Sequence, residues 1–345
     1  MANRNNYNPV CSNITSIVGE YVLGSSVNTD PYMLDFIIYA FALINGDGTL
    51  TVYSTKHLEE LGNLRAFNPN LRVIMAIGGW GADGFSDAAL TPTSRFAFAR
   101  EVQRWVNQYN LDGIDFDWEY PGSGIAGIKT RPQDGVNFTL LLEALRIVLG
   151  DARWISVAGI ADVSYIRNVE ISKIAEYIDY FNVMTYDFTA GSQGDEGDKH
   201  QSNLYTSPLS LNNISVDVYV KNLIGAGMPK EKILIGLPFY GRRGIATTVT
   251  FDNIRNNYIN SGDYMIEWDN MAKVPYITDK NGNFLLSFDD EQSIYYKGQY
   301  VLDNCLGGLF SWQSNFDQAN ILARSMNYAV NEPEKLEEII ESYYV

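Results

Sequence analysis

Eight short apolar runs recur along the chain, and amphipathic stretches lie between most of them. The runs are Ser16–Leu23, Asp35–Ile44, Leu71–Gly79, Leu111–Glu119, Trp154–Ala161, Ile178–Tyr186, Ile233–Tyr240 and Leu306–Trp312. They are rich in β-branched residues and mostly lack period-2 alternation, which is typical of parallel strands buried on both faces. Helices are predicted at His57–Phe67, Ser94–Tyr109, Gly135–Leu149, Ile171–Tyr177, Val216–Ala226 and Phe316–Ala329.

This alternation of strands and helices predicts an α/β fold of the (β/α)8, or TIM, barrel type. An open doubly wound sheet is the alternative, but no glycine fingerprint for a dinucleotide is visible. The stretch Gly241–Asp289 breaks the alternation, since it holds no strong helix. Its strand-like pieces are Ala246–Phe251, Tyr264–Asp269, Tyr276–Thr278 and Phe284–Phe288, with a hairpin turn at Asn281-Gly282.

We therefore expect a small antiparallel or α+β insertion between the seventh and eighth strands, over residues 241–288. Residues 1–240 and 289–345 would form the barrel, and the insertion would wall its C-terminal face. The acidic tail Pro333–Val345 is predicted to form a further helix.

The fourth apolar run differs from the others because it carries acidic residues. Alternate positions place Asp115, Asp117 and Glu119 on one face of the predicted strand. The other face carries Ile114, Phe116 and Trp118. Burial of several like charges is costly, so this pattern indicates a functional site. A solvated edge strand is the alternative, but the apolar residues between the acids indicate that the outer face is covered.

Neighbouring carboxylates cannot all ionise at neutral pH, so at least one pKa is expected to be raised. Glu119 stands where the strand ends, before Tyr120 and Pro121. A carboxyl group with a raised pKa at the mouth of a barrel suits general acid catalysis on a leaving oxygen. The residues themselves therefore predict acid–base chemistry of a hydrolytic kind.

Other side chains predicted at the ends of the strands would converge on the same mouth. The candidates are Trp80, Glu119, Met184, Tyr186, Asp187, Tyr240 and Trp312. Tryptophans at two separate strand ends favour a sugar-binding cleft, although each of them could also be plain packing. Trp105, on a predicted helix, and Trp154, at a strand start, are expected in the core.

Composition narrows the class of protein. The 345 residues are 46% hydrophobic and 19% charged, as in a globular protein with a sizeable core. A net charge of −16 argues against a nucleic-acid partner. The 23 Tyr, 16 Phe and 6 Trp residues fit a carbohydrate cleft as well as a core.

The two cysteines, Cys11 and Cys305, and the two histidines lack the close spacing of a zinc site. A disulfide between the cysteines is an option, but free buried thiols are the default expectation. The first sixteen residues are polar and contain no hydrophobic region of a signal peptide, and no stretch is long and apolar enough to span a membrane.

The acidic strand resembles a motif of a known family. Asp112-Gly-Ile-Asp115-Phe-Asp117-Trp-Glu119-Tyr-Pro is similar to the DxxDxDxE signature of family-18 glycoside hydrolases, the chitinase family. Further segments similar to family motifs are Ile77-Gly-Gly-Trp80, Met184-Thr-Tyr-Asp187, Leu237-Pro-Phe-Tyr-Gly-Arg242 and Gly307-Gly-Leu-Phe-Ser-Trp312. Pieces of residues 267–276 and 288–293 resemble the insertion of the family. The resemblance covers nearly the whole chain.

The resemblance implies a chitinase that hydrolyses β-1,4-N-acetylglucosamine linkages by substrate-assisted retaining catalysis, through an oxazolinium intermediate. Glu119 would protonate the glycosidic oxygen, and Asp117 and Tyr186 would act on the acetamido group. Asp115 would share a proton with Asp117. The residues that would bind the sugar chain are Trp80 on the leaving side, Trp312 as a floor, Met184, Asp187, Tyr240, Arg242 and Phe41. The resemblance implies no metal and no organic cofactor, and Asp112 would have a structural or electrostatic role.

Two positions depart from the family pattern. Ala76 stands where a serine is common in the third strand, and Glu20 stands where an aromatic residue is common in the first, with Tyr21 next. If neither position supplies a hydrogen bond, Asp115 would lose donors and the pH optimum would shift. Period 2 lets only one of Glu20 and Tyr21 face inward, which leaves that point open.

Other functions compatible with the acidic motif are an endo-N-acetylglucosaminidase acting on N-glycan cores and a catalytically inactive lectin. The intact acidic motif argues against the lectin, and the insertion argues against the endo-N-acetylglucosaminidase. The expected ligand is chitin or chitooligosaccharides, with no nucleic acid and no membrane, and an enzyme subunit of a larger assembly is a further alternative. Action outside the cell is expected from the substrate, despite the lack of a visible signal peptide.

Overall fold

The computed structural model describes residues 11, 14–24, 28–245 and 247–342. The polar stretch at residues 1–10, the expected strand start at Ala246 and the last three residues of the expected tail helix lie outside the described residues. None of the helices in the described part of the chain has the length and hydropathy of a membrane span.

The strands are β1 (Ile17–Leu23), β2 (Phe36–Ile44), β3 (Leu50–Val52), β4 (Arg72–Gly78), β5 (Gly113–Asp117), β6 (Trp154–Gly159), β7 (Tyr180–Val183), β8 (Ile233–Pro238), β9 (Tyr240–Arg243), β10 (Thr247–Thr250), β11 (Met265–Asp269), β12 (Val274–Thr278), β13 (Phe284–Ser287) and β14 (Gly308–Trp312). The helices are α1 (Thr55–Asn63), α2 (Phe85–Ala88), α3 (Pro92–Gln108), α4 (Asp134–Leu149), α5 (Val163–Asn168), α6 (Ile171–Ile174), α7 (Val216–Gly225), α8 (Phe251–Asn253), α9 (Glu291–Asn304), α10 (Ile321–Asn331) and α11 (Pro333–Ser342).

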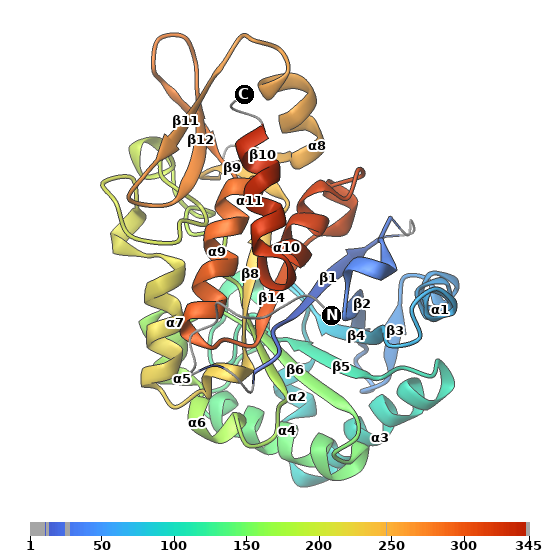
Figure 1. Ribbon diagram of the computed structural model, residues 1–345. Helices are drawn as coiled ribbons and strands as arrows, with labels where there is room; N and C mark the ends of the chain where they lie inside the picture. The colour runs from blue at the N-terminus through green and yellow to red at the C-terminus, as the bar shows by residue number, and fades with distance from the viewer. Residues whose placement is uncertain (1–10, 12–13, 25–27, 246, 343–345) are drawn as a thin grey trace.

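The predicted barrel is confirmed. Parallel strands follow the order β1-β14-β8-β7-β6-β5-β4-β2, and β1 also pairs with β2, which closes the sheet on itself. Figure 1 shows the helices arranged around these strands. The short strand β3 runs antiparallel to the end of β2 and extends one edge of the mouth.

Two elements differ from the expected alternation. In the described part of the connection from β1 to β2, the only helical element is the 3-10 turn Pro31–Met33, where a full helix would complete the repeat. Helix α9 was missed, because its many tyrosines and Gly298 obscure an amphipathic pattern. A capping box between Asp290 and Ser293 starts this helix.

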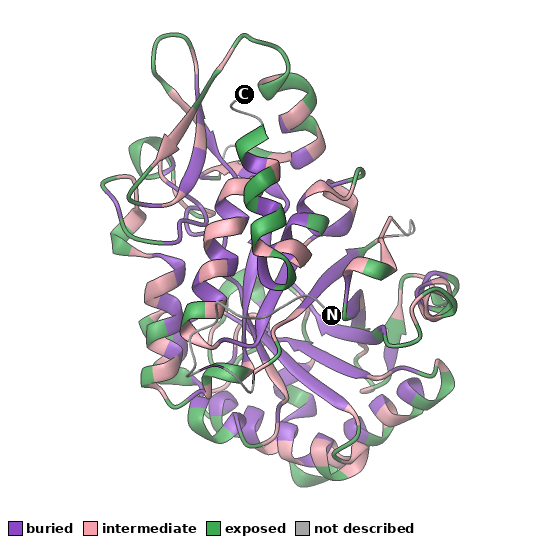
Figure 2. Ribbon diagram, viewed as in Figure 1, coloured by how far each residue is buried: buried purple, intermediate pink, exposed green. Residues whose placement is uncertain are grey.

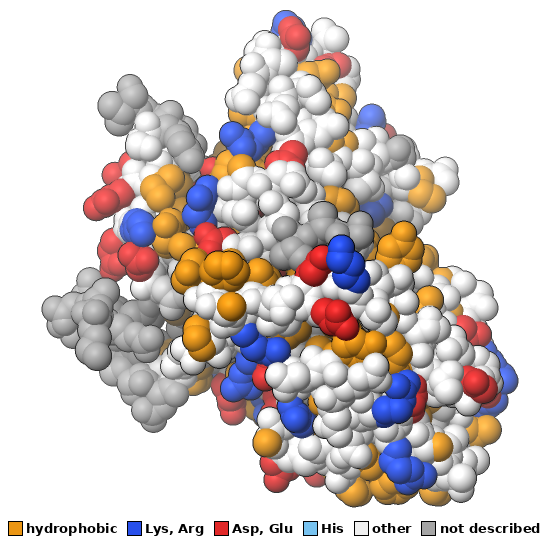
Figure 3. All heavy atoms as spheres, turned by 90° about the vertical axis from the view of Figure 1, so that its right-hand side faces the viewer, with side chains coloured by type: hydrophobic (Ala, Val, Ile, Leu, Met, Phe, Trp, Pro, Cys, Tyr) orange, Lys and Arg blue, Asp and Glu red, His pale blue; other side chains and the backbone are white. Residues whose placement is uncertain are grey.

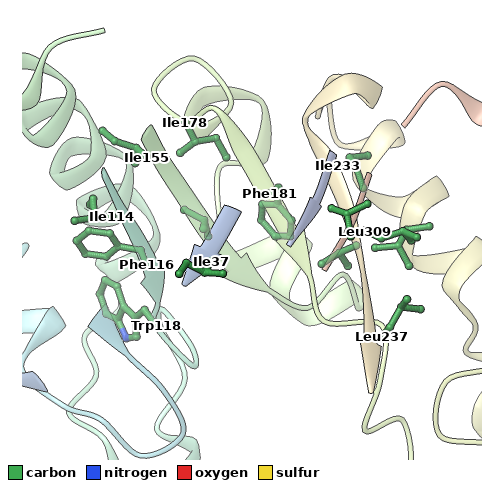
Figure 4. Packing of buried hydrophobic residues seen from close by; sticks show 14 of the residues in the cluster. Ile37, Ile114, Phe116, Trp118, Ile155, Ile178, Phe181, Ile233, Leu237 and Leu309 are labelled. Atoms are coloured by element: carbon green, nitrogen blue, oxygen red, sulfur yellow. The ribbon is translucent and has the colours of Figure 1, made fainter. Parts of the chain in front are cut away.

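Two apolar layers hold the barrel together. Phe116 and Trp118 point outward from the β5 segment into the layer between strands and helices (Figure 4), where Trp118 stacks on Phe85 at 5.3 Å between ring centroids. Figure 2 shows that the parallel strands of the barrel are buried along nearly their whole length. The interior of the barrel holds a second cluster, which includes Tyr21, Phe36, Ile38, Ile74, Trp154, Leu234 and Phe310. Trp105 and Trp154 are buried, as predicted.

A second sheet follows the seventh strand of the barrel. Its order is β10-β9-β13-β12-β11 with antiparallel pairing, and in Figure 1 it lies above the barrel. The division of the chain into a barrel and an insertion domain with boundaries at 241 and 288 stays a prediction. Lys297 of α9 forms a buried ion pair with Asp289, two residues after β13, and also donates to Ser202. Ser202 donates in turn to the carbonyl of Thr185, which precedes Tyr186.

The expectation of free thiols is wrong. Cys11 and Cys305 form a disulfide with 5.3 Å between their Cα atoms, although 294 residues separate them in sequence. Cys305 directly follows α9 with φ of 58°, so the helix end turns this side chain toward the N-terminal segment. Sequence spacing carries no information on such a distant pair.

Candidate active site

The structure brings the predicted site residues together at the C-terminal ends of the barrel strands. Phe41 lies in β2, Trp80 follows β4, Glu119 follows β5, Met184, Tyr186 and Asp187 follow β7, Tyr240 and Arg242 lie in β9 just after β8, and Trp312 ends β14. Gly79 has φ of 95°, and a Cβ atom there would stand 2.8 Å from the Phe41 ring. Glycine therefore lets the end of β4 pass close to Phe41, and Trp80, next in the chain, is 64% exposed.

Asp115 lies at the centre of a hydrogen-bond network inside the barrel. The Tyr21 hydroxyl donates to one carboxylate oxygen at 2.7 Å, and Ser156 Oγ and Asn182 Nδ2 donate to the other at 2.6 and 3.1 Å. Burial raises the pKa of Asp115 to about 6, and the hydrogen bonds from Ser156 and Tyr21 oppose this rise. The carboxyl group therefore keeps a substantial ionised population near neutral pH.

This network resolves the two departures from the family pattern. Tyr21 faces the interior, whereas Glu20 is buried on the outer side of β1. In the sheet register, Ala76 of β4 and Ser156 of β6 lie on either side of Asp115. A hydroxyl on β6 thus occupies the position across from the missing serine of β4. The expected loss of donors does not occur.

Asp117 and Glu119 form a coupled pair at the mouth. Their side chains are hydrogen-bonded to each other, and the second Asp117 oxygen, Oδ1, is buried without a partner in the described residues. Burial, followed by the charges of Glu119 and Asp115, raises the pKa of Asp117 well above its ordinary value. The hydrogen bond between them raises the pKa of Asp117 and lowers that of Glu119, so Asp117 is the donor in the pair.

Burial also raises the pKa of Glu119, to about 7. Hydrogen bonds from Tyr120 and Asp117 limit the rise, and the negative charge of Asp187 adds to it. A carboxyl group that is half protonated near neutral pH can give and take a proton in one catalytic cycle.

Polar and aromatic side chains surround this acid pair. Asp187 accepts a hydrogen bond from the Tyr240 hydroxyl at 2.7 Å and forms an ion pair with Arg242 at 2.7 Å. The Trp312 ring stacks on Phe41 with 5.6 Å between centroids and an interplanar angle of 25°. Tyr186 packs edge-on against Tyr240 and Phe310, and Met184 belongs to the same interior cluster. The site thus has an aromatic floor and a polar side.

A family model described as glycosyl hydrolases family 18 matches residues 13–317. The chain belongs to this family. The match confirms the prediction that the protein is a family 18 glycoside hydrolase.

Several relatives of the family 18 chain have been described. It is 33% identical over 309 residues to chitinase A1 of Niallia circulans, in a match that covers 78% of this chain and 44% of that protein. The chain therefore spans less than half of this relative. Its structure is similar to the chitinase domain of the spore coat protein CotE from Clostridium difficile, with 56% identity, 99% of both chains covered and a TM-score of 0.74. It is also similar to a family 18 N-acetylglucosaminidase from Paenibacillus barengoltzii, with 33% identity, 91% and 100% covered and a TM-score of 0.83.

The sequence did not predict three residues of this family 18 site, namely Ser156, Asn182 and Tyr120. Asn182 alternates with Met184 and Tyr186, so period 2 already placed it on the inward face. Ser156 stands alone in an apolar strand and gives no comparable signal. Asp112 lies at the opposite end of the barrel, where it accepts from the Val73 amide at 2.7 Å and pairs with Arg65.

Proposed function

We propose that this protein hydrolyses β-1,4-linked N-acetylglucosamine polymers by substrate-assisted retaining catalysis. The observation that carries the proposal is the coupled pair of Asp117 and Glu119 at the mouth of the barrel, with the pKa of Glu119 raised to about 7. The names of two relatives, a chitinase and a chitinase domain, support the choice of substrate.

In this mechanism Glu119 donates its proton to the glycosidic oxygen as the bond to the anomeric carbon breaks. The carbonyl oxygen of the 2-acetamido group attacks that carbon from the opposite side and forms an oxazolinium ion. Asp117 accepts a hydrogen bond from the acetamido nitrogen once its proton has passed to Asp115, and Tyr186 donates to the acetamido oxygen. Ionised Glu119 then takes a proton from water, which attacks the anomeric carbon and regenerates the sugar with its original configuration.

The remaining residues hold the sugar chain. Trp312 forms the floor beneath the reacting sugar, because an aromatic ring stacks on the apolar face of a pyranose. Residues that line the same subsite are Met184, Asp187, Tyr240 and Arg242, with Phe41 beside the floor and Trp80 on the leaving side. A single charged pair between Asp187 and Arg242 leaves the subsite suited to neutral sugars.

A second candidate is release of single N-acetylglucosamine units, because one similar structure is that of an N-acetylglucosaminidase. The 56% identical relative is a domain of a spore coat protein, which supports the alternative that this chain acts within a larger assembly. Action outside the cell remains part of the proposal.

The test is hydrolysis of a fluorogenic chitooligosaccharide series by the wild type, Glu119→Gln and a matched surface control, Glu176→Gln. Glu176 is exposed and lies before β7, at the other end of the barrel. Loss of the general acid should reduce kcat about 10²- to 10⁴-fold, and the control should leave it unchanged. Products longer than one sugar favour the chitinase, and single sugars favour the second candidate. If the wild type binds oligomers without turnover, the protein is a lectin.

A further inference from the structure

Four consecutive polar residues are fully buried next to the proposed active site. They are His200, Gln201, Ser202 and Asn203, and none of them has any exposed surface. They lie outside the helices and the named strands, so no regular element accounts for their position. Polar side chains are seldom buried this completely unless hydrogen bonds within the protein satisfy them. The contacts of residues 200–203 therefore indicate what the segment does.

Two neighbours in this segment hold the two chain segments that form the polar side of the site. Gln201 Nε2 donates a hydrogen bond to the carbonyl of Tyr240 at 2.7 Å. Ser202 Oγ donates to the carbonyl of Thr185, the residue before Tyr186, at 2.8 Å. Both contacts are made to backbone groups, so they act on the course of the chain and not on a single rotamer.

The residues after β7 need such support, because the pairing of β7 with its neighbours ends at Val183. Four residues further on, Asp187 has φ of 61°. A residue other than glycine keeps this left-handed conformation only when its surroundings hold it there. The amide of Phe188 donates to the carbonyl of Gln201 at 3.2 Å. Residues 200–203 thus hold the turn that carries Tyr186 from both sides.

A buried ion pair sets the direction of the Ser202 hydroxyl. Lys297 Nζ donates to Ser202 Oγ at 2.8 Å and to both carboxylate oxygens of Asp289 at 2.7 Å. A lysine ammonium group can only donate, so the Ser202 oxygen accepts from it and the hydroxyl hydrogen is left for the Thr185 carbonyl. Figure 3 shows charged side chains spread over one face of the molecule, whereas Lys297 and Asp289 are at most 1% exposed.

We propose that Ser202, oriented by Lys297, is a positioning residue for Tyr186. The Thr185 carbonyl belongs to the peptide group that ends at the nitrogen of Tyr186, so its hydrogen bond fixes the direction in which the Tyr186 side chain enters the site. The inference rests on the proposed function, in which Tyr186 donates to the acetamido oxygen that attacks the anomeric carbon. Ser202 has no exposed surface and acts only through this peptide group.

The first test is Ser202→Ala, which removes the hydroxyl and leaves the ion pair in place. Misplacement of Tyr186 should lower kcat on the fluorogenic chitooligosaccharides about 10- to 100-fold, because the chemical step depends on its position. KM should stay close to the wild-type value, because the sugar chain keeps its other contacts. The matched control is Ser325→Ala, since the buried Ser325 hydroxyl also donates to a carbonyl at 2.8 Å, that of Ile321 within α10. The control should leave kcat and KM unchanged.

A double-mutant cycle with Tyr186→Phe separates positioning from a general loss of structure. Tyr186→Phe removes the hydroxyl that Ser202 is proposed to place, so adding Ser202→Ala should lower kcat by a much smaller factor than it does in the wild type. An equal factor in both backgrounds, or a wild-type kcat in Ser202→Ala, overturns the positioning role and leaves the proposed hydrolysis standing. If Ser202→Ala does not fold, Ser202→Cys, which keeps a weak donor at this position, takes its place in the cycle.

A different outcome separates this inference from the proposed function. If the wild type binds oligomers without turnover, the proposed hydrolysis is rejected, and the same cycle is measured as the Kd for the oligomers by tryptophan fluorescence. A smaller effect of Ser202→Ala in the Tyr186→Phe background then supports the positioning role, and an equal effect overturns it.

Discussion

Glu20 is predicted to make the protein less stable as the pH rises from acidic to mildly alkaline values. The side chain is fully buried on the outer side of β1. Neither carboxylate oxygen makes a hydrogen bond of good geometry within the described residues, and the nearby Thr29 hydroxyl offsets the burial only in part. Burial first, and then the charges of Asp317 and Asp30, raise the pKa of Glu20 to about 8.

The sign of the effect follows from proton linkage. Below the ordinary pKa of 4.5, Glu20 is protonated in the folded and the unfolded chain, and the native state is not penalised. Between this value and about 8, the unfolded chain loses the proton while the folded chain keeps it, so the free energy of unfolding falls. At about 1.4 kcal/mol per pH unit the loss reaches roughly 5 kcal/mol near pH 8 and then stays constant.

The perturbation is Glu20→Gln, which keeps the shape of the side chain and removes its titration. Urea unfolding curves at pH 4, 6 and 8 should show a variant close to the wild type at pH 4 and more stable by several kcal/mol at pH 8. The matched control is Glu59→Gln, at an exposed position on α1. A difference between Glu20→Gln and the wild type that stays constant from pH 4 to pH 8 would refute the reasoning.

Three further predictions concern the site and the disulfide. Tyr120→Phe removes a hydrogen bond that lowers the pKa of Glu119, so the alkaline limb of the kcat/KM profile should move to higher pH; a limb at the wild-type pH contradicts this. Ser156→Ala removes a donor to a buried carboxylate and should lower kcat about 10- to 100-fold. Adding Ala76→Ser to it should restore most of the activity, and failure to recover would show that the two register positions are not equivalent. Cys11→Ser should lower the free energy of unfolding by about 2–4 kcal/mol with kcat intact, and equal denaturation midpoints would count against this.

The local pattern of hydrophobic and polar residues was sufficient to predict most of the fold. The eight parallel strands coincide with the apolar runs, because strands buried on both faces need nearly continuous hydrophobic sequence. The acidic alternation of β5 correctly separated the inward carboxylates from outward Phe116 and Trp118. Helix α9 was missed, since most of its stabilisation comes from packing against α10 and α11, a tertiary effect.

The site was predictable only where a side chain belongs to a local motif. Ser156 acquires its role from the register that sets it beside Asp115, and register is a property of the closed sheet. The orientation of Glu20 and Tyr21 likewise depends on which face of β1 meets the interior, which period 2 cannot decide for a strand that is apolar on both faces. The disulfide of Cys11 depends on the meeting of two distant segments.

The donors to Asp115 also tie catalysis to the order of folding. Tyr21 and Asn182 meet across the barrel although 161 residues separate them, and the sheet closes where β1, which also pairs with β2, pairs with β14 near the end of the chain. In a chain whose central strands have formed but whose β1 and β14 are not yet paired, the hydroxyl of Tyr21 does not reach the carboxylate of Asp115. Recovery of activity during refolding therefore reports the closing of the barrel, whereas recovery of helical signal reports only the earlier assembly of its parts.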